Sequence, residues 1–397
     1  MRKRNNIFTI NKFKKTYAHA KLNTCVCIIT FPLSLAGYIP LSNLVNLLHD
    51  IFDKVYIVSG GAALEKLKKE KNIWAFKVTH RTSSNLFMRL INSVGTQLKI
   101  LRYVAEISKN VDLFIFSIGG DGLFVPLLIL RLLRKNVILM PGGISTKVYS
   151  IKKDPLSKLL MVLDSLTFSL ADRLIIYSRG MIQEANLGKY QHKIIIAHEH
   201  FVDLTKFTAF KKFYERLKLV GYIGRLSEEK GVLNLIEAMP LVLKKGEDIH
   251  FVIYGDGILA AEIKKTIKTK DLEAYVKLTG WISHEDVPQY LNEFRLLVLT
   301  SFTEGLPNIM LEAMACGTPV LATPVGAITD IIMEGRTGFL LKSNDPKHIA
   351  ERIVELLDKP EILEKISINA YWYIKENFSY EKTLTAWQKI FSELGVS

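Results

Sequence analysis

The feature that most constrains the fold of this chain is an alternation of short apolar, β-branched segments with longer segments of helical periodicity, and it occurs in both halves. This pattern is typical of parallel sheets covered by helices. The short segments are almost continuously apolar, which indicates strands buried on both faces. We predict strands at 24–30, 54–59, 112–117, 136–140, 173–177 and 193–197, and then at 217–223, 249–254, 274–279, 296–299, 319–322 and 339–341. The predicted fold class is α/β, with two doubly wound domains.

The linker between the two domains is predicted at residues 199–214, which mix charged and aromatic side chains without a clear period. At 397 residues the chain exceeds what one hydrophobic core usually supports, so two domains are the economical prediction. Two such domains leave a cleft that faces the carboxyl ends of both sheets, where open α/β folds bind ligands.

Nothing in the sequence predicts a membrane span, a signal peptide or a metal site. The longest apolar candidate, 113–130, contains Asp121 and several glycines and falls short of the ~18 uncharged residues that a spanning helix needs. The first twenty residues are basic without an apolar core and cleavage site, so the expected location is the cytoplasm. Cys25, Cys27 and Cys316 lack zinc-binding spacing, and we expect buried, reduced thiols.

The most informative segment runs from 299 to 320, where a predicted strand is followed by a loop and a helix. The loop carries Glu304, and Pro307 suits the first turn of a helix that ends before Gly317. Free backbone N–H groups and the positive end of the helix dipole would meet a ligand here, which predicts a diphosphate site. The predicted binding residues of this turn are Gly305, Leu306, Pro307, Asn308 and Ile309.

Two carboxylates, Glu304 and Glu312, bracket this turn. Carboxylates beside a phosphate site are electrostatically unusual unless they accept hydrogen bonds from neutral hydroxyls, such as those of a sugar or ribose. The alternative for Glu312 is an ordinary solvated helix residue. Within this strand, loop and helix, we favour the hydroxyl-binding interpretation.

A second basic loop follows the first strand of the second domain and contains Arg225 and Lys230, punctuated by Gly224 and Gly231. Arginine offers a planar fork to phosphate oxygens and lysine a mobile point charge. We predict that the pair neutralises a leaving diphosphate without a metal ion. The alternative is that both are surface charges beside Glu228 and Glu229.

These motifs together resemble the large group-1, or family 4, glycosyltransferases. The resemblance runs from about 217 to 341 and rests on GRLSEEKG at 224–231, Gly255, Gly280-Trp281, and EGLPNIMLEAMACGTP at 304–319. It implies the GT-B fold, in which two Rossmann-like domains face each other across a cleft and a C-terminal helix crosses back to the first domain. We therefore expect an acceptor-side domain at 1–205, a nucleotide-sugar-binding domain at 206–376 and the returning helix at 377–397.

The resemblance also implies roles for individual residues. Arg225 and Lys230 would hold the donor diphosphate, Glu304 the donor sugar and Glu312 the ribose. The residues placed near the nucleotide base are Gly255, Trp281 and Ile282, and Gly224 is a further predicted donor-binding residue. The retaining outcome of the family implies a front-face reaction, in which the leaving phosphate oxygen deprotonates the acceptor. No protein nucleophile, metal ion or other cofactor is expected.

The first half resembles the family less closely. Gly37 stands in place of a glycine-rich loop after the first strand, and we include it among the donor-binding residues. After the strand 136–140, where many members have a histidine near the reacting sugar, this chain has Pro141, Gly142 and Gly143. No catalytic histidine is therefore carried over from the family. His198 and His200 near the linker are not expected to act directly.

All excess positive charge lies in the first half, since residues 1–200 carry 29 Lys and Arg against 12 Asp and Glu, whereas residues 201–397 carry 24 against 27. Segments 87–99 and 123–135 mix apolar faces with cations, as membrane-surface helices do, although core helices share this pattern. We expect peripheral association with the anionic inner face of the cell membrane and a glycan or lipid-linked acceptor. Without a recognised nucleic-acid module, no nucleic-acid partner is expected.

The predicted function is a retaining hexosyltransferase that uses a nucleotide sugar in the assembly of surface polysaccharide, glycolipid or glycan. Two alternatives remain open. One is a non-catalytic protein that binds sugar nucleotides, against which the intact donor motifs argue. The other is a sugar-nucleotide 2-epimerase, which shares the two-domain architecture but lacks the Glu304 and Glu312 context and the Arg225 and Lys230 loop in this form.

Overall fold

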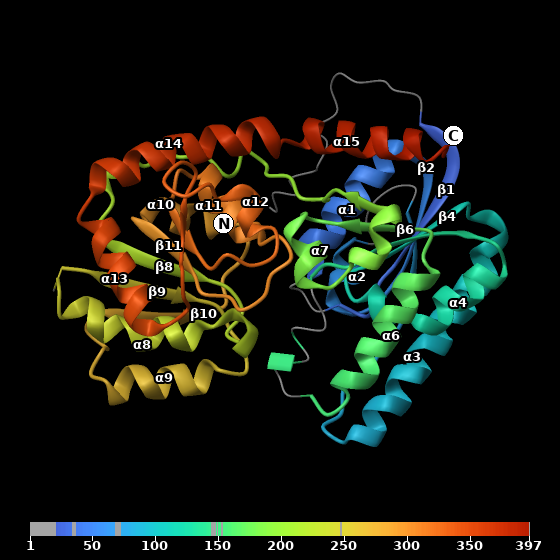
Figure 1. The fold of residues 1–397 in the computed structure, drawn as a ribbon, viewed down its shortest axis with the longest axis horizontal. Helices are drawn as coiled ribbons and strands as arrows, with labels where there is room; N and C mark the ends of the chain where they lie inside the picture. Colours follow the sequence, from blue (N-terminus) through green and yellow to red (C-terminus); the bar gives the residue numbers. More distant parts are fainter. Residues whose placement is uncertain are drawn as a thin grey trace, which may run out of the picture.

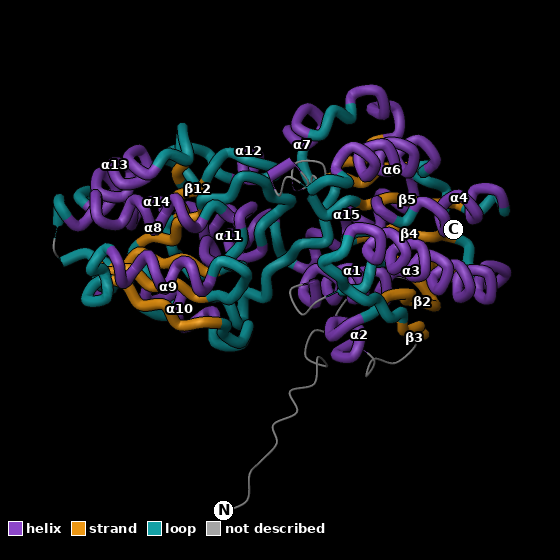
Figure 2. Tube along the Cα trace, turned by 90° about the horizontal axis from the view of Figure 1, so that it is seen from below, coloured by secondary structure: helices purple, strands orange, loops and turns teal. Residues whose placement is uncertain are grey.

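The computed structural model describes residues 21–33, 37–67, 73–143, 148, 150–151, 154–246 and 248–396. Within them the chain forms two domains, each built on a parallel sheet, that lie side by side (Figures 1 and 2). The basic N-terminal segment lies outside the described residues. No helix in the described part of the chain has the length and apolar character needed to cross a membrane.

The first domain contains a seven-stranded sheet, in the order β3-β2-β1-β4-β5-β6-β7 among the described residues. Its strands are β1 (Leu22–Ile29), β2 (Phe52–Ser59), β3 (Ile73–Lys77), β4 (Leu113–Ser117), β5 (Asn136–Met140), β6 (Arg173–Ile176) and β7 (Ile194–Ile196). Helices α1 (Tyr38–Ile51) and α2 (Gly61–Leu67) cover one face. Helices α3 (Leu86–Ile107), α4 (Phe124–Leu132) and α6 (Ser157–Leu170) cover the other, and α7 (Gly180–Glu184) follows β6.

The second domain repeats this design with the sheet order β10-β9-β8-β11-β12-β13 in the described residues. Its strands are β8 (Leu219–Ile223), β9 (His250–Tyr254), β10 (Val276–Gly280), β11 (Leu296–Leu299), β12 (Val320–Ala322) and β13 (Phe339–Leu340). Helices α8 (Val232–Leu243), α9 (Ala260–Thr269) and α13 (Pro346–Leu357) pack on one face. Helices α10 (Val287–Glu293), α11 (Asn308–Ala315) and α14 (Pro360–Asn377) pack on the other, and α12 (Ile328–Ile331) follows β12.

The predicted α/β class with two doubly wound domains is confirmed, and every predicted strand begins within two residues of an observed one. The prediction missed β3, a five-residue edge strand in which no residue is fully buried although four of them are apolar. In both sheets the strand order reverses beside the first strand of the domain, so the loops at the carboxyl ends diverge there and leave room for ligands.

The last helix, α15 (Tyr380–Glu393), leaves the second domain and packs on the first (Figure 1). The Tyr380 hydroxyl donates a hydrogen bond to Asp50 of α1 (2.6 Å), and Phe391 packs edge-on against Phe52 at a ring separation of 4.8 Å. Trp387 is fully buried beneath the helix. The returning helix that the family resemblance implied is therefore present, whereas the exact domain boundaries remain a prediction.

The two segments predicted as membrane-surface helices differ in the structure. On α3 an apolar stripe is exposed to solvent, consisting of Phe87, Ile91, Val94 and Leu98. The apolar residues of α4, which packs between α3 and α6, are buried or half-buried except at its end, where Leu132 and Leu133 are exposed, so a membrane-surface role of 123–135 remains a prediction. A stripe that the prediction missed lies on α6, where Leu159, Val162 and Leu166 are exposed.

The cysteines are unpaired, as expected. Cys27 and Cys316 are buried, and burial raises the pKa of the Cys316 thiol to about 12. Cys25 is only half-buried, so for this residue the expectation of a buried packing residue was wrong.

Candidate active site

The loop between β11 and α11 (residues 300–307) places a helix N-terminus at the junction of the two domains. Pro307 has extended backbone angles and is the N-cap residue, one position before the first turn in which it was expected. No side chain caps this helix end, which leaves its N–H groups available to a ligand. Gly305 is required because a Cβ at this position would overlap the carbonyl oxygen of Gly142 in the first domain.

Glu304 and Lys230 form an ion pair at the start of this turn. The Lys230 Nζ lies 2.6 Å and 2.8 Å from the two carboxylate oxygens of Glu304, and the Ser301 hydroxyl donates a further hydrogen bond of 2.6 Å. Both side chains are largely buried. Since an ammonium group has three N–H donors, one remains for a phosphate or hydroxyl oxygen. The loop predicted to bind phosphate and the loop predicted to bind sugar hydroxyls therefore meet at one point.

The backbone explains why these loops meet. Gly231, which ends the β8–α8 loop, has the left-handed backbone angle φ of 60°, and a Cβ there would overlap the carbonyl oxygen of Thr300. The Thr300 hydroxyl in turn donates to the Gly231 carbonyl at 2.9 Å. Lys230 is thereby held beside the loop that carries Glu304.

Arg225 extends from the same β8–α8 loop, and its side chain is 56% exposed. Its guanidinium group lies 3.5 Å from Glu229, a longer ion pair than that of Lys230. Arg225 therefore lies as a surface charge beside Glu229, as the alternative interpretation predicted, whereas Lys230 is largely buried. Because the guanidinium group is exposed and its ion pair is long, an incoming anion can compete for Arg225 with the buried Glu229.

Glu312 is buried in the middle of α11, so the alternative of an ordinary solvated helix residue was wrong. Its carboxylate lies 2.7 Å from the Nε2 atom of His284, whose ring packs near Phe207. The sequence analysis missed His284. Its place three residues after Trp281, in a loop already assigned to the donor, was the available signal.

The remaining predicted donor-binding residues of the second domain lie in loops joined by backbone hydrogen bonds. The Gly224 N–H donates to Tyr254 and the Gly255 N–H donates to Gly280, at 3.0 and 2.8 Å. Trp281 is largely exposed and Ile282 is half-buried next to it. The loops after β8, β9 and β10 therefore form one continuous edge beside Glu312.

Gly37, the one predicted donor-binding residue of the first domain, is the N-cap residue of α1. The atoms nearest to a Cβ built there belong to Leu33, and residues 34–36 of the predicted loop lie outside the described part of the chain. The structure does not place Gly37 with the other site residues, and its donor role remains a prediction.

The first domain closes the site through the loops after β5 and β6. Gly142 and Tyr177 lie against Gly305, and the Ser178 hydroxyl donates to the Gly326 carbonyl at 3.3 Å. Glu184 accepts a hydrogen bond of 3.0 Å from the Gly326 N–H. The turn predicted to bind a diphosphate thus lies at the contact between the domains.

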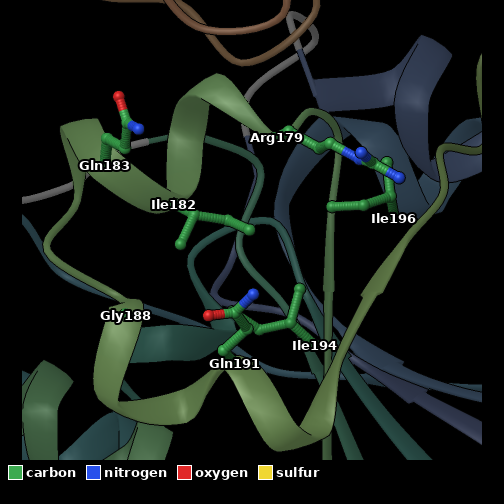
Figure 3. Close-up of a pocket in the computed structure, with 7 residues that line it drawn as sticks. All are labelled: Arg179, Ile182, Gln183, Gly188, Gln191, Ile194 and Ile196. Atoms are coloured by element: carbon green, nitrogen blue, oxygen red, sulfur yellow. The ribbon is translucent and has the colours of Figure 1, made fainter.

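A separate cavity of about 630 Å³ opens beside this junction, at the β7 edge of the first sheet (Figure 3). Its lining residues are Arg179, Ile182, Gln183, Gly188, Gln191, Ile194 and Ile196. None of them is a predicted site residue. The predicted absence of a metal ion remains untested, although no group of three or more His, Cys, Asp or Glu side chains in the described residues could hold one.

Two facing parallel-sheet domains, with paired Lys230 and Glu304 beside an uncapped helix end at their junction, have the architecture of the GT-B fold. Residues 205–372 match the family model of group-1 glycosyl transferases. The second domain is therefore a group-1 glycosyltransferase domain, and the resemblance found in the sequence is confirmed.

Relatives of known sequence align with part of the chain. The α-D-kanosaminyltransferase of Streptomyces kanamyceticus is 36% identical over 152 residues, which cover 38% of this chain and 39% of that protein. The poly(ribitol-phosphate) α-N-acetylglucosaminyltransferase of Staphylococcus aureus is 33% identical over 183 residues, 46% of this chain and 36% of that protein. The chain thus spans less than half the length of either relative.

Solved structures are similar over almost the whole chain. The Anabaena protein HepE in complex with UDP and glucose has a TM-score of 0.74 at 18% identity, covering 92% of this chain and 99% of that one. The S. aureus protein TarM, in a complex that contains UDP, has a TM-score of 0.73 at 17% identity, covering 93% and 99%. At these identities the similarity establishes the fold alone.

Proposed function

We propose that this protein is a retaining hexosyltransferase that moves a sugar from a nucleotide sugar to a hydroxyl of a glycan or lipid-linked acceptor. The proposal rests mainly on the Lys230–Glu304 pair at the uncapped N-terminus of α11. A leaving diphosphate is anionic, and this point combines a helix end with a lysine and a nearby arginine. The UDP complexes of HepE and TarM support a nucleoside diphosphate as the ligand.

In the proposed reaction each residue acts on charge or position, and no protein nucleophile is needed. Arg225, Lys230 and the α11 N–H groups stabilise the departing diphosphate, whose oxygen accepts the proton of the acceptor hydroxyl. Glu304 accepts hydrogen bonds from the donor sugar, and Glu312 binds the ribose. With two cations in place, the proposed reaction is independent of metal. The product enters cell-surface polysaccharide, glycolipid or glycan assembly.

Calorimetric titration with UDP-, GDP-, ADP- and TDP-sugars tests this proposal. We expect saturable binding of one nucleotide sugar, and about tenfold weaker binding in Arg225→Ala because one charge-assisted hydrogen bond is lost. Arg336→Ala is the matched control, since Arg336 is exposed on the same domain and lies outside the site. Absence of binding to every member of the panel would contradict the proposed transferase, and also the alternative of a non-catalytic protein that binds sugar nucleotides.

We further propose that the first domain binds an anionic membrane surface through the exposed stripes of α3 and α6. Phe87, Ile91, Val94 and Leu98 are spaced to lie on one helix face, and Phe87 is 69% exposed. Arg89 of α3 pairs with Asp154, just before α6, at 2.5 Å, which brings the two stripes together. The exposed cations around the stripes are Arg81, Lys99, Arg102 and Lys158. Apolar side chains surrounded by cations suit lipid headgroups of negative charge.

The double variant Phe87→Glu, Ile91→Glu tests the membrane proposal in a vesicle-sedimentation assay with phosphatidylserine-containing vesicles. We expect binding to fall by at least about tenfold, since each inserted side chain contributes about 1.5–3 kcal/mol. Ile258→Glu is the control, because Ile258 is 78% exposed but lies on the second domain. Unchanged vesicle binding in the double variant, or salt-sensitive binding to DNA instead of vesicles, would contradict the proposal.

A further inference from the structure

The two crossings of the chain between the domains lie against each other. One is the linker at 198–202 and the other is Phe378, between α14 and α15. The Val202 N–H donates to the Phe378 carbonyl at 2.9 Å, and the His198 ring stacks on Phe378 with centroids 4.8 Å apart. Trp387 of α15 donates its indole N–H to the His198 carbonyl at 2.9 Å. Any change in the angle between the domains would therefore move these two segments together.

A buried polar cluster follows directly in the linker. The Tyr177 hydroxyl donates to one carboxylate oxygen of Glu199 at 2.9 Å, and the Glu199 side chain is fully buried. The other carboxylate oxygen lies 3.7 Å from the Nδ1 atom of His200, and neither of these two atoms has a hydrogen-bond partner in the described structure. Buried polar atoms without partners are costly, which indicates a role beyond packing.

Burial favours the uncharged forms of the side chains in this cluster. It raises the pKa of Glu199 to about 7, with the Tyr177 hydrogen bond opposing the shift, and it lowers the pKa of His200 well below its usual value. Glu199 therefore exchanges its proton near neutral pH, whereas His200 stays uncharged there.

The cluster supports the β11–α11 loop from the side opposite the Lys230–Glu304 pair. The Tyr177 ring lies against Gly305, where a Cβ would come within 3.0 Å of the ring atom Cε2. His200 packs edge-on against Tyr177, with centroids 5.0 Å apart, and interacts with the Leu306 backbone. Thr383 of α15 donates to the His200 carbonyl at 3.1 Å, which links the loop to the returning helix.

We infer that Tyr177, Glu199 and His200 are positioning residues. They hold the Gly305–Leu306 backbone in the position that lets the N-terminus of α11 bind the donor diphosphate. The inference rests on the proposed function, because it assumes that this helix end binds a diphosphate. The three side chains act through the backbone of the loop. Their loss should weaken diphosphate binding while the Lys230–Glu304 pair remains.

Calorimetric titration of the full chain with UDP, GDP, ADP, TDP and inorganic pyrophosphate tests the inference. Tyr177→Phe keeps the ring against Gly305 but removes the hydrogen bond to Glu199, and we expect the affinity for the nucleotide that wild type binds to fall about tenfold. Glu199→Gln retains an acceptor for Tyr177 and a neutral charge, so its affinity should stay within about threefold of wild type. If every substitution at this buried position disrupted the fold, Glu199→Gln would lose affinity as well. Retained affinity in this variant therefore argues against a purely structural effect.

Tyr190→Phe is the control, because the Tyr190 hydroxyl also donates a hydrogen bond, to the Ser165 carbonyl at 2.8 Å, which is partly buried and lies outside the junction. Its affinity should equal that of wild type even where its unfolding temperature falls. Thr383→Val provides a second route if Tyr177→Phe fails to fold, and it should weaken binding through the His200 link. Wild-type affinity in the folded variants Tyr177→Phe and Thr383→Val would overturn the inference, whereas absence of binding by wild type itself would contradict the proposed function.

Discussion

Lys230→Ala should lower the rate of sugar transfer by ~10²–10³-fold, the usual effect of removing one charge-stabilising group from a transition state. The lysine has an N–H left for the departing diphosphate after donating two hydrogen bonds to Glu304. Glu304→Ala should reduce the rate comparably, since it removes both the sugar acceptor group and the partner that orients Lys230. The measurement is the initial rate with the donor identified by the binding panel.

Stability must be followed in the same variants, because removing one partner leaves the other partly buried without its opposite charge. The double variant Lys230→Met, Glu304→Gln removes both charges and should recover much of any lost stability without recovering activity. Lys218→Ala is the control, since Lys218 forms a 2.7 Å ion pair with Asp248 in the exposed surface of the same domain. Transfer within tenfold of wild type in Lys230→Ala would refute the assigned role of this residue.

Arg216→Met should lower the free energy of unfolding by about 3–5 kcal/mol, because it removes several buried hydrogen bonds from a charged group, each of which contributes about 1.5–3 kcal/mol. The guanidinium group is buried and donates to six acceptors in three segments of the second domain. They are the backbone oxygens of Lys211, Phe294, Cys316 and Gly317, with the side chains of Asn292 and Thr318. Methionine fills similar volume but satisfies none of them.

The location of Arg216 links this stability effect to the site. Two of its acceptors, Cys316 and Gly317, lie at the C-terminal end of α11, where a cation also complements the helix dipole. The other end of α11 is the proposed diphosphate site, so donor affinity should fall together with stability. Urea unfolding of Arg216→Met, Arg216→Lys and the surface control Arg102→Ala checks the prediction. Arg216→Lys should recover little stability, because an ammonium group cannot reach acceptors on several sides.

The family of the second domain and the strand, turn and helix of the proposed donor site could be predicted from the sequence because their signals are local. The strand before Leu299, the glycine and proline of the following turn, and the first residues of α11 are adjacent in the chain. The prediction for Glu312 placed it correctly on α11, but its partner His284 was missed. The pairing joins the loop after β10 to helix α11, and no local sequence pattern specifies the distance between these two segments.

The two segments predicted as membrane-surface helices show the same limit. The segments 87–99 and 123–135 have comparable mixtures of apolar and basic residues, yet α3 exposes an apolar stripe along its length, whereas α4 exposes apolar residues only at its end. The difference arises because α4 packs between α3 and α6. Helical periodicity predicts that a helix has an apolar face, but not which neighbour covers it.

The sequence by itself determined the α/β class, the two repeated units and the strand, turn and helix of the donor motif, because strand and helix periods and the backbone limits of glycine and proline act over a few residues. Only the tertiary structure decided that Lys230 pairs with Glu304, that Arg216 holds the far end of α11, and that the Tyr177–Glu199–His200 cluster supports the donor loop. These contacts join residues far apart in the chain. Their distances depend on strand order and on the packing of one domain against the other, which no local pattern specifies.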